Sequence, residues 1–291
     1  MEHFPEGRVR RILSDSLFTS ARPIYWDEYF NYASSPTFAK LERRFGCRLF
    51  PRLAFFTGPK GAGKTSAARI CGMIASCNRI LAHLKIEPDA RGLRPCGICE
   101  ACVAVQSSEA HENDNYRELN ASHALFPDHL ENALKARHYG GWRRDPHVPL
   151  TIAIDEAAGL SKDQWKMMHK EVEDVQGVCF IFVMRLTEKP QISEPMQDRM
   201  LNKEYEFQIP SLLDTVNGIR RLMSQLGLNI DVESARILAN SGRSSMRGVL
   251  ESLDDTRDLW PTITADAIRG RFRPLLEDSA VRNRGADEVD D

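Results

Sequence analysis

The chain has 291 residues, of which 42% are hydrophobic and 27% are charged. This balance is typical of a folded globular protein and excludes disordered, collagen-like and fibrous classes. The length is enough for about two structural units. Because the 39 Lys and Arg residues are matched by 41 Asp and Glu residues, binding to nucleic acid would depend on a local basic surface rather than on the net charge.

The apolar runs of the chain are too short for a membrane span, which needs roughly 20 residues. The longest extends from Cys179 to Met184, and the first residues are charged, with no apolar signal region. We therefore expect a cytoplasmic protein that neither crosses a membrane nor is secreted. In that compartment the seven cysteines are expected to bind metal, to pack in the core or to react, rather than to form disulfides.

Residues up to about 50 are polar and aromatic, and we expect a lead-in of short helical pieces that packs beside the next part of the chain. Leu53 to Thr57 then form an apolar run that ends at a glycine, and Thr65 to Ser76 are mostly small and apolar. This order predicts a buried strand, a tight loop and a helix.

The loop in this unit has the pattern G-x-x-x-x-G-K-[ST] of a phosphate-binding loop. Its glycines allow backbone N–H groups to turn toward phosphate oxygens, while Lys64 adds a positive charge and Thr65 offers a hydroxyl to Mg²⁺. The helix that comes next directs its positive dipole end to the same anion. The residues expected to bind the nucleotide phosphates are Gly58, Pro59, Lys60, Gly61, Ala62, Gly63, Lys64 and Thr65.

A cysteine cluster comes next, in a stretch from Asn78 to Val103 that we interpret as an inserted knob. Cys96, Cys99 and Cys102 have the two-residue spacing of a zinc knuckle, which needs a fourth donor. The candidates are Cys77 and Cys71, with His83 and His111 as further possibilities. Four thiolates would form a closed structural Zn²⁺ site. An iron–sulfur cluster and free packed thiols are the alternatives.

Two acidic residues stand at the end of the next buried strand. The pattern from Tyr116 suggests a strand edge and then an amphipathic helix over His129 to Tyr139, and Leu150 to Ile154 predict a strand that ends at Asp155 and Glu156. Asp155 can hold Mg²⁺ or its water shell, and Glu156 can polarise an attacking water. Such pairs are also common at helix starts, but the upstream phosphate loop favours the catalytic interpretation.

The remaining elements complete two domains. Ser161 opens a helix that extends to about Glu173, and Val178 to Val183 predict a third apolar strand, so that strands and helices alternate as in a parallel α/β sheet. Beyond Pro210 only helical periodicity remains, over Leu212 to Leu226, Val232 to Asn240, Ser245 to Asp258 and Ala265 to Leu276. We expect a nucleotide-binding domain over 1–210, a small helical domain over 211–276 and an acidic tail over 277–291.

Together these residues resemble the gamma/tau ATPase subunits of the bacterial DNA polymerase III clamp loader, which are AAA+ proteins. The matching positions are Ala21 to Pro23, Gly58 to Ser66, Cys77, Pro95 to Cys102, Asp155-Glu156, Leu160 to Lys162, Asp198 to Met200 and Ser244 to Arg247. The resemblance implies an AAA+ phosphate-loop sheet with an inserted zinc knob at about 77–102 and a helical lid domain. It also implies ATP, Mg²⁺ and Zn²⁺ as cofactors, and it selects Cys77 over Cys71 as the fourth zinc ligand.

The resemblance implies further site residues. Ser66 belongs to the matched phosphate loop, and Arg199 occupies the position of the arginine finger that reaches the ATP site of a neighbouring subunit. Arg247 matches the lid arginine called sensor 2, which would contact the γ-phosphate. The stretch after the third strand lacks the usual pair of threonines, so that Thr187 is the weak candidate for the polar sensor 1 residue.

The implied function is that of an ATP-binding and ATP-hydrolysing clamp-loader-like subunit in DNA replication. Its partners would be other clamp-loader AAA+ subunits, a sliding clamp and primer–template DNA, with no membrane. Because the resemblance ends near Leu276, before the family's collar domain, we expect the chain to depend on collar-bearing partners. The alternative is an AAA+ regulatory switch of a mobile-element or defence system that loads no clamp. An interaction subunit without ATPase activity is disfavoured by the intact phosphate loop.

Two basic groups could contact DNA phosphates, although such groups are commonly only solvated faces. Their members are Lys135, Arg137, Arg143 and Arg144 in one group, and Arg269, Arg271 and Arg273 in the other.

Overall fold

The computed structural model describes residues 17, 21–107, 115–139, 149–241, 245–260 and 268. Within them, the predicted parallel α/β sheet is confirmed. It has five strands in the order β2-β3-β4-β1-β5, and every pair is parallel. The strands are β1 (Leu53–Thr57), β2 (Tyr116–Asn120), β3 (Leu150–Asp155), β4 (Val178–Met184) and β5 (Glu204–Glu206).

The edge strands β2 and β5 are less buried than the three strands in the middle. All residues of β1 and β4 are buried, as are all but the last of β3, which explains their continuous apolar sequences. By contrast, β5 has the sequence Glu-Tyr-Glu and only its tyrosine is buried. This strand was not predicted, because three residues of alternating polarity give too weak a signal without knowledge of their pairing with β1.

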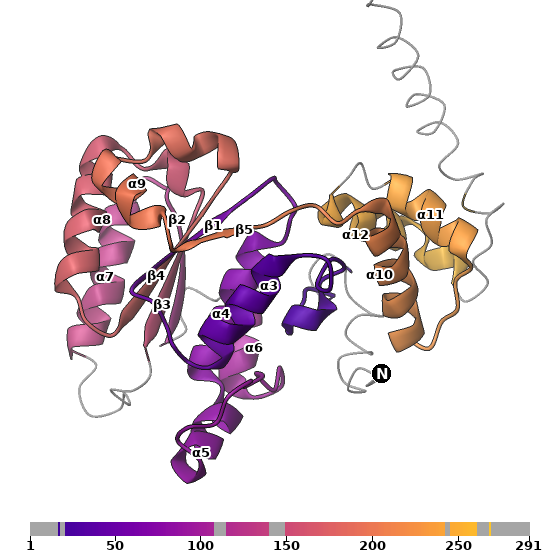
Figure 1. Cartoon of the computed structure of the whole chain (residues 1–291), viewed down its shortest axis with the longest axis horizontal. Coiled ribbons are helices and arrows are strands. Elements are labelled where there is room, and N and C mark those ends of the chain that lie inside the picture. The colour runs from indigo at the N-terminus through magenta and orange to yellow at the C-terminus, as the bar shows by residue number, and fades with distance from the viewer. Residues whose placement is uncertain are drawn as a thin grey trace, which may run out of the picture. The chain divides into compact units, whose positions relative to one another are not determined.

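Helices cover both faces of the sheet (Figure 1). On one face lie α7 (Phe126–Tyr139) and α8 (Lys162–Asp174), whose buried residues join the strands in one apolar core. On the other face lies α4 (Lys64–Ser76). The next helices along the chain are α5 (Asn78–Ile86) and α6 (Glu100–Gln106). The shorter elements are η1 (Trp26–Glu28), α3 (Pro36–Leu41), the π-helix η2 (Glu42–Gly46), η5 (Ala157–Gly159), η6 (Leu186–Gln191) and α9 (Glu194–Met200).

The chain divides into two compact units. The sheet unit consists of Pro23–Glu28 and Ser35–Gln208. The helical unit consists of the described residues from Ile209 onward together with those up to Arg22 and in Tyr29–Ser34. Its helices are α10 (Leu212–Gln225), α11 (Val232–Ser241), α12 (Met246–Asp255) and η7 (Arg257–Leu259). The predicted helix over Ala265 to Leu276 and the acidic tail lie outside the described residues, apart from Ile268.

Parts of the lead-in belong to the helical unit. Leu17 is fully buried in the core of that unit, and its backbone N–H donates to Asp254 Oδ2 at 2.8 Å. Tyr29 accepts a hydrogen bond on its carbonyl oxygen from Arg221 Nη2 at 3.0 Å. Phe30 packs against α10 at Gly218, where a Cβ atom would lie 2.1 Å from Phe30 Cγ. None of the described helices is both long and apolar enough to cross a bilayer.

We predict that Gly218→Ala destabilises the helical unit. Although alanine favours a helix, its Cβ would overlap the Phe30 ring, and overpacking of this kind costs about 1–3 kcal/mol. Thermal unfolding followed by circular dichroism should show the loss. Asn217→Ala, one residue earlier on the exposed side of α10, serves as the control and should leave the transition in place. Equal stability of the two variants would contradict the packing at Gly218.

Candidate nucleotide-binding site and metal centre

The phosphate loop leaves β1 through a backbone that only glycine tolerates. Gly58 has φ 138°, and a Cβ atom on it would lie 2.2 Å from the carbonyl oxygen of Phe207. Phe207 is fixed there because its N–H donates to Thr57 O at 2.7 Å. At the other end, Gly63 precedes α4 in the left-handed conformation, with φ 86°. The loop geometry is therefore determined by backbone contacts as well as by the motif.

Lys64 is the first residue of α4, directly after Gly63, and is buried. Its Nζ donates to the carbonyl oxygens of Gly58 at 2.8 Å and Pro59 at 2.6 Å. Burial lowers the pKa of Lys64 to about 8, although the charges of Asp155 and Glu188 oppose that change. A bound phosphate would add negative charge and favour the protonated amine. Of the other loop residues, Ala62 is buried, Lys60 is exposed and Ser66 is half-buried.

Thr65 and Asp155 meet at the start of α4. Thr65 Oγ1 donates to Asp155 Oδ2 at 2.9 Å, while Asp155 Oδ1 accepts from the backbone N–H of Glu156 at 2.8 Å. Burial raises the pKa of Asp155, and the carboxylates of Glu118 and Glu156 add to this rise, which the hydrogen bonds from Thr65 and the Glu156 N–H counteract. A hydroxyl and a partly desolvated carboxylate are hard oxygen donors of the kind that Mg²⁺ prefers.

Glu156 is the next residue and has an unusual backbone. Its φ of 52° and ψ of 36° lie in the left-handed region, which non-glycine residues rarely occupy. Unlike Asp155, Glu156 is exposed. Strained residues of this kind concentrate at functional sites, where the surrounding structure holds them. The carboxylate is thus available to a water at the edge where β3 ends.

A cation that was not predicted from the sequence lies at the same edge. Thr57 and Met184 are paired in register, so that Arg185 comes after β4 at the level where the phosphate loop comes after β1. Glu188 Oε2 accepts the Arg185 N–H at 2.7 Å, and Oε1 lies 3.6 Å from Arg185 Nε. The charges of both residues act on Lys64. Thr187, the predicted sensor residue, is exposed in η6. The signal available in the sequence was a cation directly after a fully apolar strand.

The structure brings together Cys77, Cys96, Cys99 and Cys102, whose sulfur atoms all lie within 4.8 Å of one another. Tetrahedral Zn²⁺ with Zn–S bonds of about 2.3 Å requires sulfurs roughly 3.8 Å apart, so that this arrangement fits zinc with little movement. The Cys102 thiol and the backbone N–H of Cys96 donate hydrogen bonds to Cys77 Sγ, and these bonds lower the pKa of Cys77. A lower pKa favours the thiolate, which is the form that binds a metal.

The alternative ligands lie elsewhere. Cys71 is fully buried beside Cys179, and burial raises its pKa. His83 pairs with Glu87 at 3.3 Å on α5, and His111 lies outside the described residues. Four cysteine sulfurs leave no open coordination position, which indicates a structural rather than a catalytic metal. The donor set also accommodates an iron–sulfur cluster.

The two predicted arginines lie in different units. Arg199 is on α9 of the sheet unit and pairs with Glu173 on α8. About one third of the Arg199 side chain is exposed (34%). Arg247 is exposed on α12 of the helical unit. Beside it in sequence, Met246 and Ser245 help to line a cavity of about 130 Å³.

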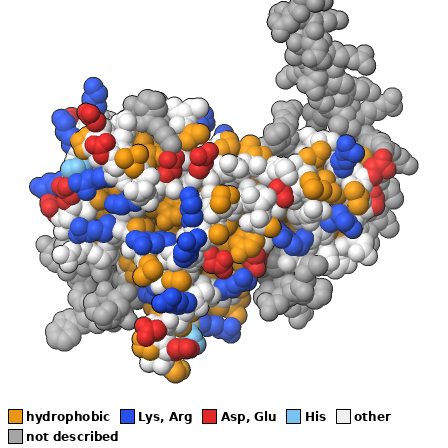
Figure 2. All heavy atoms as spheres, in the orientation of Figure 1, with side chains coloured by type: hydrophobic (Ala, Val, Ile, Leu, Met, Phe, Trp, Pro, Cys, Tyr) orange, Lys and Arg blue, Asp and Glu red, His pale blue; other side chains and the backbone are white. Residues whose placement is uncertain are grey.

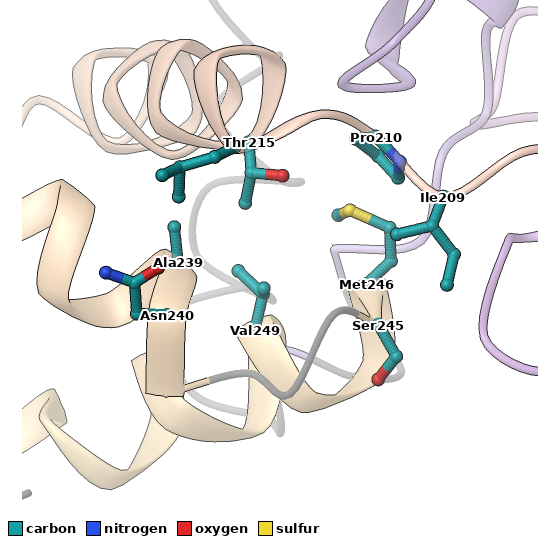
Figure 3. A pocket seen from close by; sticks show the side chains of 9 residues that line it. Ile209, Pro210, Thr215, Ala239, Asn240, Ser245, Met246 and Val249 are labelled. Carbon is teal, nitrogen blue, oxygen red and sulfur yellow. The ribbon is translucent and has the colours of Figure 1, made fainter. Parts of the chain in front are cut away.

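That cavity lies wholly within the helical unit (Figure 3). Val249, Thr215 and Met246 extend toward it from α12 and α10, and Pro210 closes one side. The lining combines apolar side chains with the hydroxyls of Thr215 and Ser245 and the amide of Asn240.

The described residues include a basic surface that was not predicted. Lys and Arg side chains gather on the face of the sheet unit that carries α3 and α4 (Figure 2), where Lys40, Arg43 and Arg44 are exposed. Of the predicted groups, Lys135 is exposed but pairs with Glu131 at 2.5 Å. The other members lie outside the described side chains, namely Arg137, Arg143, Arg144, Arg269, Arg271 and Arg273.

Comparison with known proteins supports the resemblance found in the motifs. No family model matches the chain. The chain is 23% identical over 233 residues to Protein STICHEL-like 4 of Arabidopsis thaliana, which covers 79% of this chain and 21% of the relative. It is 26% identical over 204 residues to DNA polymerase III subunit gamma/tau of Mycobacterium tuberculosis, which covers 68% of this chain and 32% of the relative. The chain thus spans less than a third of either relative.

A solved structure matches the fold. The RuvB Holliday junction branch migration motor of Thermotoga maritima superposes with a TM-score of 0.57 at 18% identity, covering 87% of this chain and 72% of that one. The fold is therefore of the AAA+ type, and the chain is similar to clamp-loader ATPase subunits.

We predict that the purified protein contains one zinc ion per chain. Cys99→Ser should lose that zinc, because three thiolates and a hydroxyl hold it more weakly. Elemental analysis of freshly purified protein is the measurement. Cys47→Ser, which changes a cysteine outside the cluster, should keep the metal. Iron in place of zinc, or wild-type protein free of metal, would contradict the prediction.

Proposed function

We propose that this chain binds and hydrolyses ATP as a clamp-loader-type subunit in DNA replication. The observation that carries the proposal is the hydrogen bond from Thr65 to Asp155, because it sets two Mg²⁺-type oxygen donors beside the phosphate loop. The similarity to a gamma/tau subunit of DNA polymerase III supports the replication role.

Nucleotide binding would use the loop and Lys64. The ammonium group of Lys64 has three donors, and the carbonyls of Gly58 and Pro59 take two. The third would bind the outer phosphates together with the backbone N–H groups of the loop. Thr65 and Asp155 would hold Mg²⁺, which neutralises charge on the phosphates. In this scheme Gly58 to Ser66 form the binding site.

Hydrolysis would use the acidic pair and three arginines. Glu156 would orient a water and take its proton, while the water oxygen bonds to the γ-phosphorus and the bond to the ADP oxygen breaks. Arg185 extends from the same edge and would offset charge that develops on the phosphate. Arg199 would reach the ATP site of a neighbouring subunit, and Arg247 would contact the nucleotide from the helical unit.

We predict different outcomes for two substitutions in this site. Lys64→Ala should weaken ATP binding and abolish turnover, because the charge at the phosphates is lost. Glu156→Gln should retain binding but lower turnover at least about a hundredfold, because the amide cannot take a proton. A fluorescent ATP analogue and a phosphate-release assay separate the two effects. Lys40→Ala, on an exposed lysine of α3, is the control. Wild-type affinity in Lys64→Ala would refute the binding scheme.

The replication role predicts that turnover rises when a sliding clamp, primed DNA and partner subunits are added. Arg199→Ala should lose this stimulation yet bind ATP with unchanged affinity, because the finger acts on the neighbour's site. Glu173→Gln, which releases Arg199 from its partner, should retain the stimulation. Turnover of the wild type that does not respond to clamp and DNA would favour the alternative of a regulatory switch ATPase.

A further inference from the structure

The phosphate-loop helix is attached to the sheet by two polar contacts one turn apart. Thr65 and Arg69 lie on the same face of α4 because they are four residues apart. Thr65 binds Asp155 on β3, and Arg69 binds Glu118 on β2 through two parallel bonds, Nε to Oε2 at 2.7 Å and Nη2 to Oε1 at 2.9 Å. The second contact is mostly shielded from solvent, since only 13% of the Arg69 side chain and 21% of the Glu118 side chain are exposed.

Arg69 has a second partner in the segment from Cys77 to Gln106 that carries the four clustered cysteines, which we call the cysteine module. Its Nη1 donates to the carbonyl oxygen of Gln106 at 3.1 Å. Gln106 is the last residue of α6, the helix that starts after Cys99 and carries Cys102. The Gln106 side chain in turn donates through Nε2 to the carbonyl oxygen of Gly97 at 3.3 Å, within the turn between Cys96 and Cys99. One guanidinium group therefore joins the end of the cysteine module to β2.

The β2 side of this connection leads to Asp155. In the parallel register Asn120 pairs with Asp155, and the Ala121 N–H donates to Asp155 O at 2.9 Å. Glu118 also accepts from the Tyr116 hydroxyl at 3.0 Å. The Tyr116 ring leaves α4 no room to shift, because a Cβ atom on Gly72 would lie 2.3 Å from Tyr116 Cδ2. Because the packing here is tight, a shift of the Arg69 side chain would move Glu118 and β2, and through β2 it would reach Asp155.

Metal occupancy would decide whether α6 keeps this position. A bound Zn²⁺ would hold together the four sulfurs, which lie within 4.8 Å of one another. Within the module, N–H to sulfur bonds of 3.3 Å join Cys96 to Cys77 and Cys99 to Cys96. The helix α6 also packs on α4, with Val105 fully buried and Gln106 Nε2 donating to Met73 Sδ at 3.4 Å, so that movement of the cysteine turn would act on α6 where it adjoins α4. If α6 moves, Arg69 loses the Gln106 carbonyl and its charge must be satisfied by other groups, which is costly for a shielded ion pair.

We propose that Arg69 is a positioning residue that couples the cysteine module to the phosphate-loop site, so that zinc bound at Cys77, Cys96, Cys99 and Cys102 strengthens the binding of Mg-nucleotide at Thr65 and Asp155. The inference rests on the proposed nucleotide site. Coupling between two sites is reciprocal, and therefore Mg-nucleotide must strengthen zinc binding by the same factor.

The test measures both directions with Mg-ADP, which avoids turnover. Zinc affinity is measured by competition with a chromophoric chelator, with and without saturating Mg-ADP, and Mg-ADP affinity is measured with and without zinc. We expect each ligand to raise the affinity for the other about tenfold in the wild type, which is within the usual range of such couplings. Arg69→Lys keeps the charge but loses the forked geometry, and it should reduce both factors to less than twofold.

The matched control is Arg79→Lys, on an exposed arginine of α5 in the same module, and it should keep the full coupling. Should Arg69→Lys fail to fold by circular dichroism, Gln106→Ala removes the bond to Gly97 and should also lower the coupling. Independent binding of zinc and Mg-ADP in the wild type, or full coupling in the variants of this path, would overturn the inference alone. Absence of Mg-ADP binding by the zinc-loaded wild type would overturn the proposed function as well.

Discussion

The candidate site depends on one hydrogen bond, from Thr65 to Asp155, between residues that are 90 positions apart. The sheet order places β4 between β3 and β1, so that the loop after β1 and the acids after β3 are not on adjacent strands. They meet because α4 lies across the sheet face and its first residues extend toward β3. Parallel pairing makes this possible, since it brings the carboxyl ends of all strands to one edge. The position of Lys64, the oxygen donors and the exposed Glu156 all result from that crossing.

The parts of the fold that could be predicted are those in which a local pattern has a single physical meaning. An apolar run of strand length, such as Val178–Met184, is typical of a buried strand in a globular chain of this kind. Gly58 and Gly63 mark positions where the backbone has a positive φ, which residues with a side chain rarely adopt. The spacing of Cys96, Cys99 and Cys102 likewise predicts a compact turn, whereas Cys77 was selected by the family resemblance, and the structure places all four sulfurs together.

The parts that could not be predicted depend on contacts between distant residues. Glu204–Glu206 is a strand because its neighbours bond to β1, with Phe55 N–H donating to Lys203 O and Phe207 N–H donating to Thr57 O. Arg185 lies at the site because β1 and β4 pair in a particular register, and no local sequence pattern predicts that register. The sequence predicts that the lead-in packs beside the next part of the chain, yet Phe30 packs on α10, nearly 190 positions further along. Periodicity does not encode such pairings.

Two arginine–glutamate pairs in the sheet unit differ in burial, and this difference determines whether the contact is fixed or can be exchanged for another. Arg199 and Glu173 are about one third and one half exposed (34% and 47%), and a solvated pair of this kind contributes only about 0–1 kcal/mol. Arg199 can therefore leave Glu173 at little cost, as the proposed contact with the ATP of a neighbouring subunit would require. Arg69 and Glu118 are mostly shielded and bonded at both ends. Removing one partner there would leave a shielded charge unpaired, which costs several times more. The same residue types are thus suited to opposite tasks: the exposed pair to exchanging partners, and the shielded pair to holding α4, β2 and the cysteine module in fixed relation.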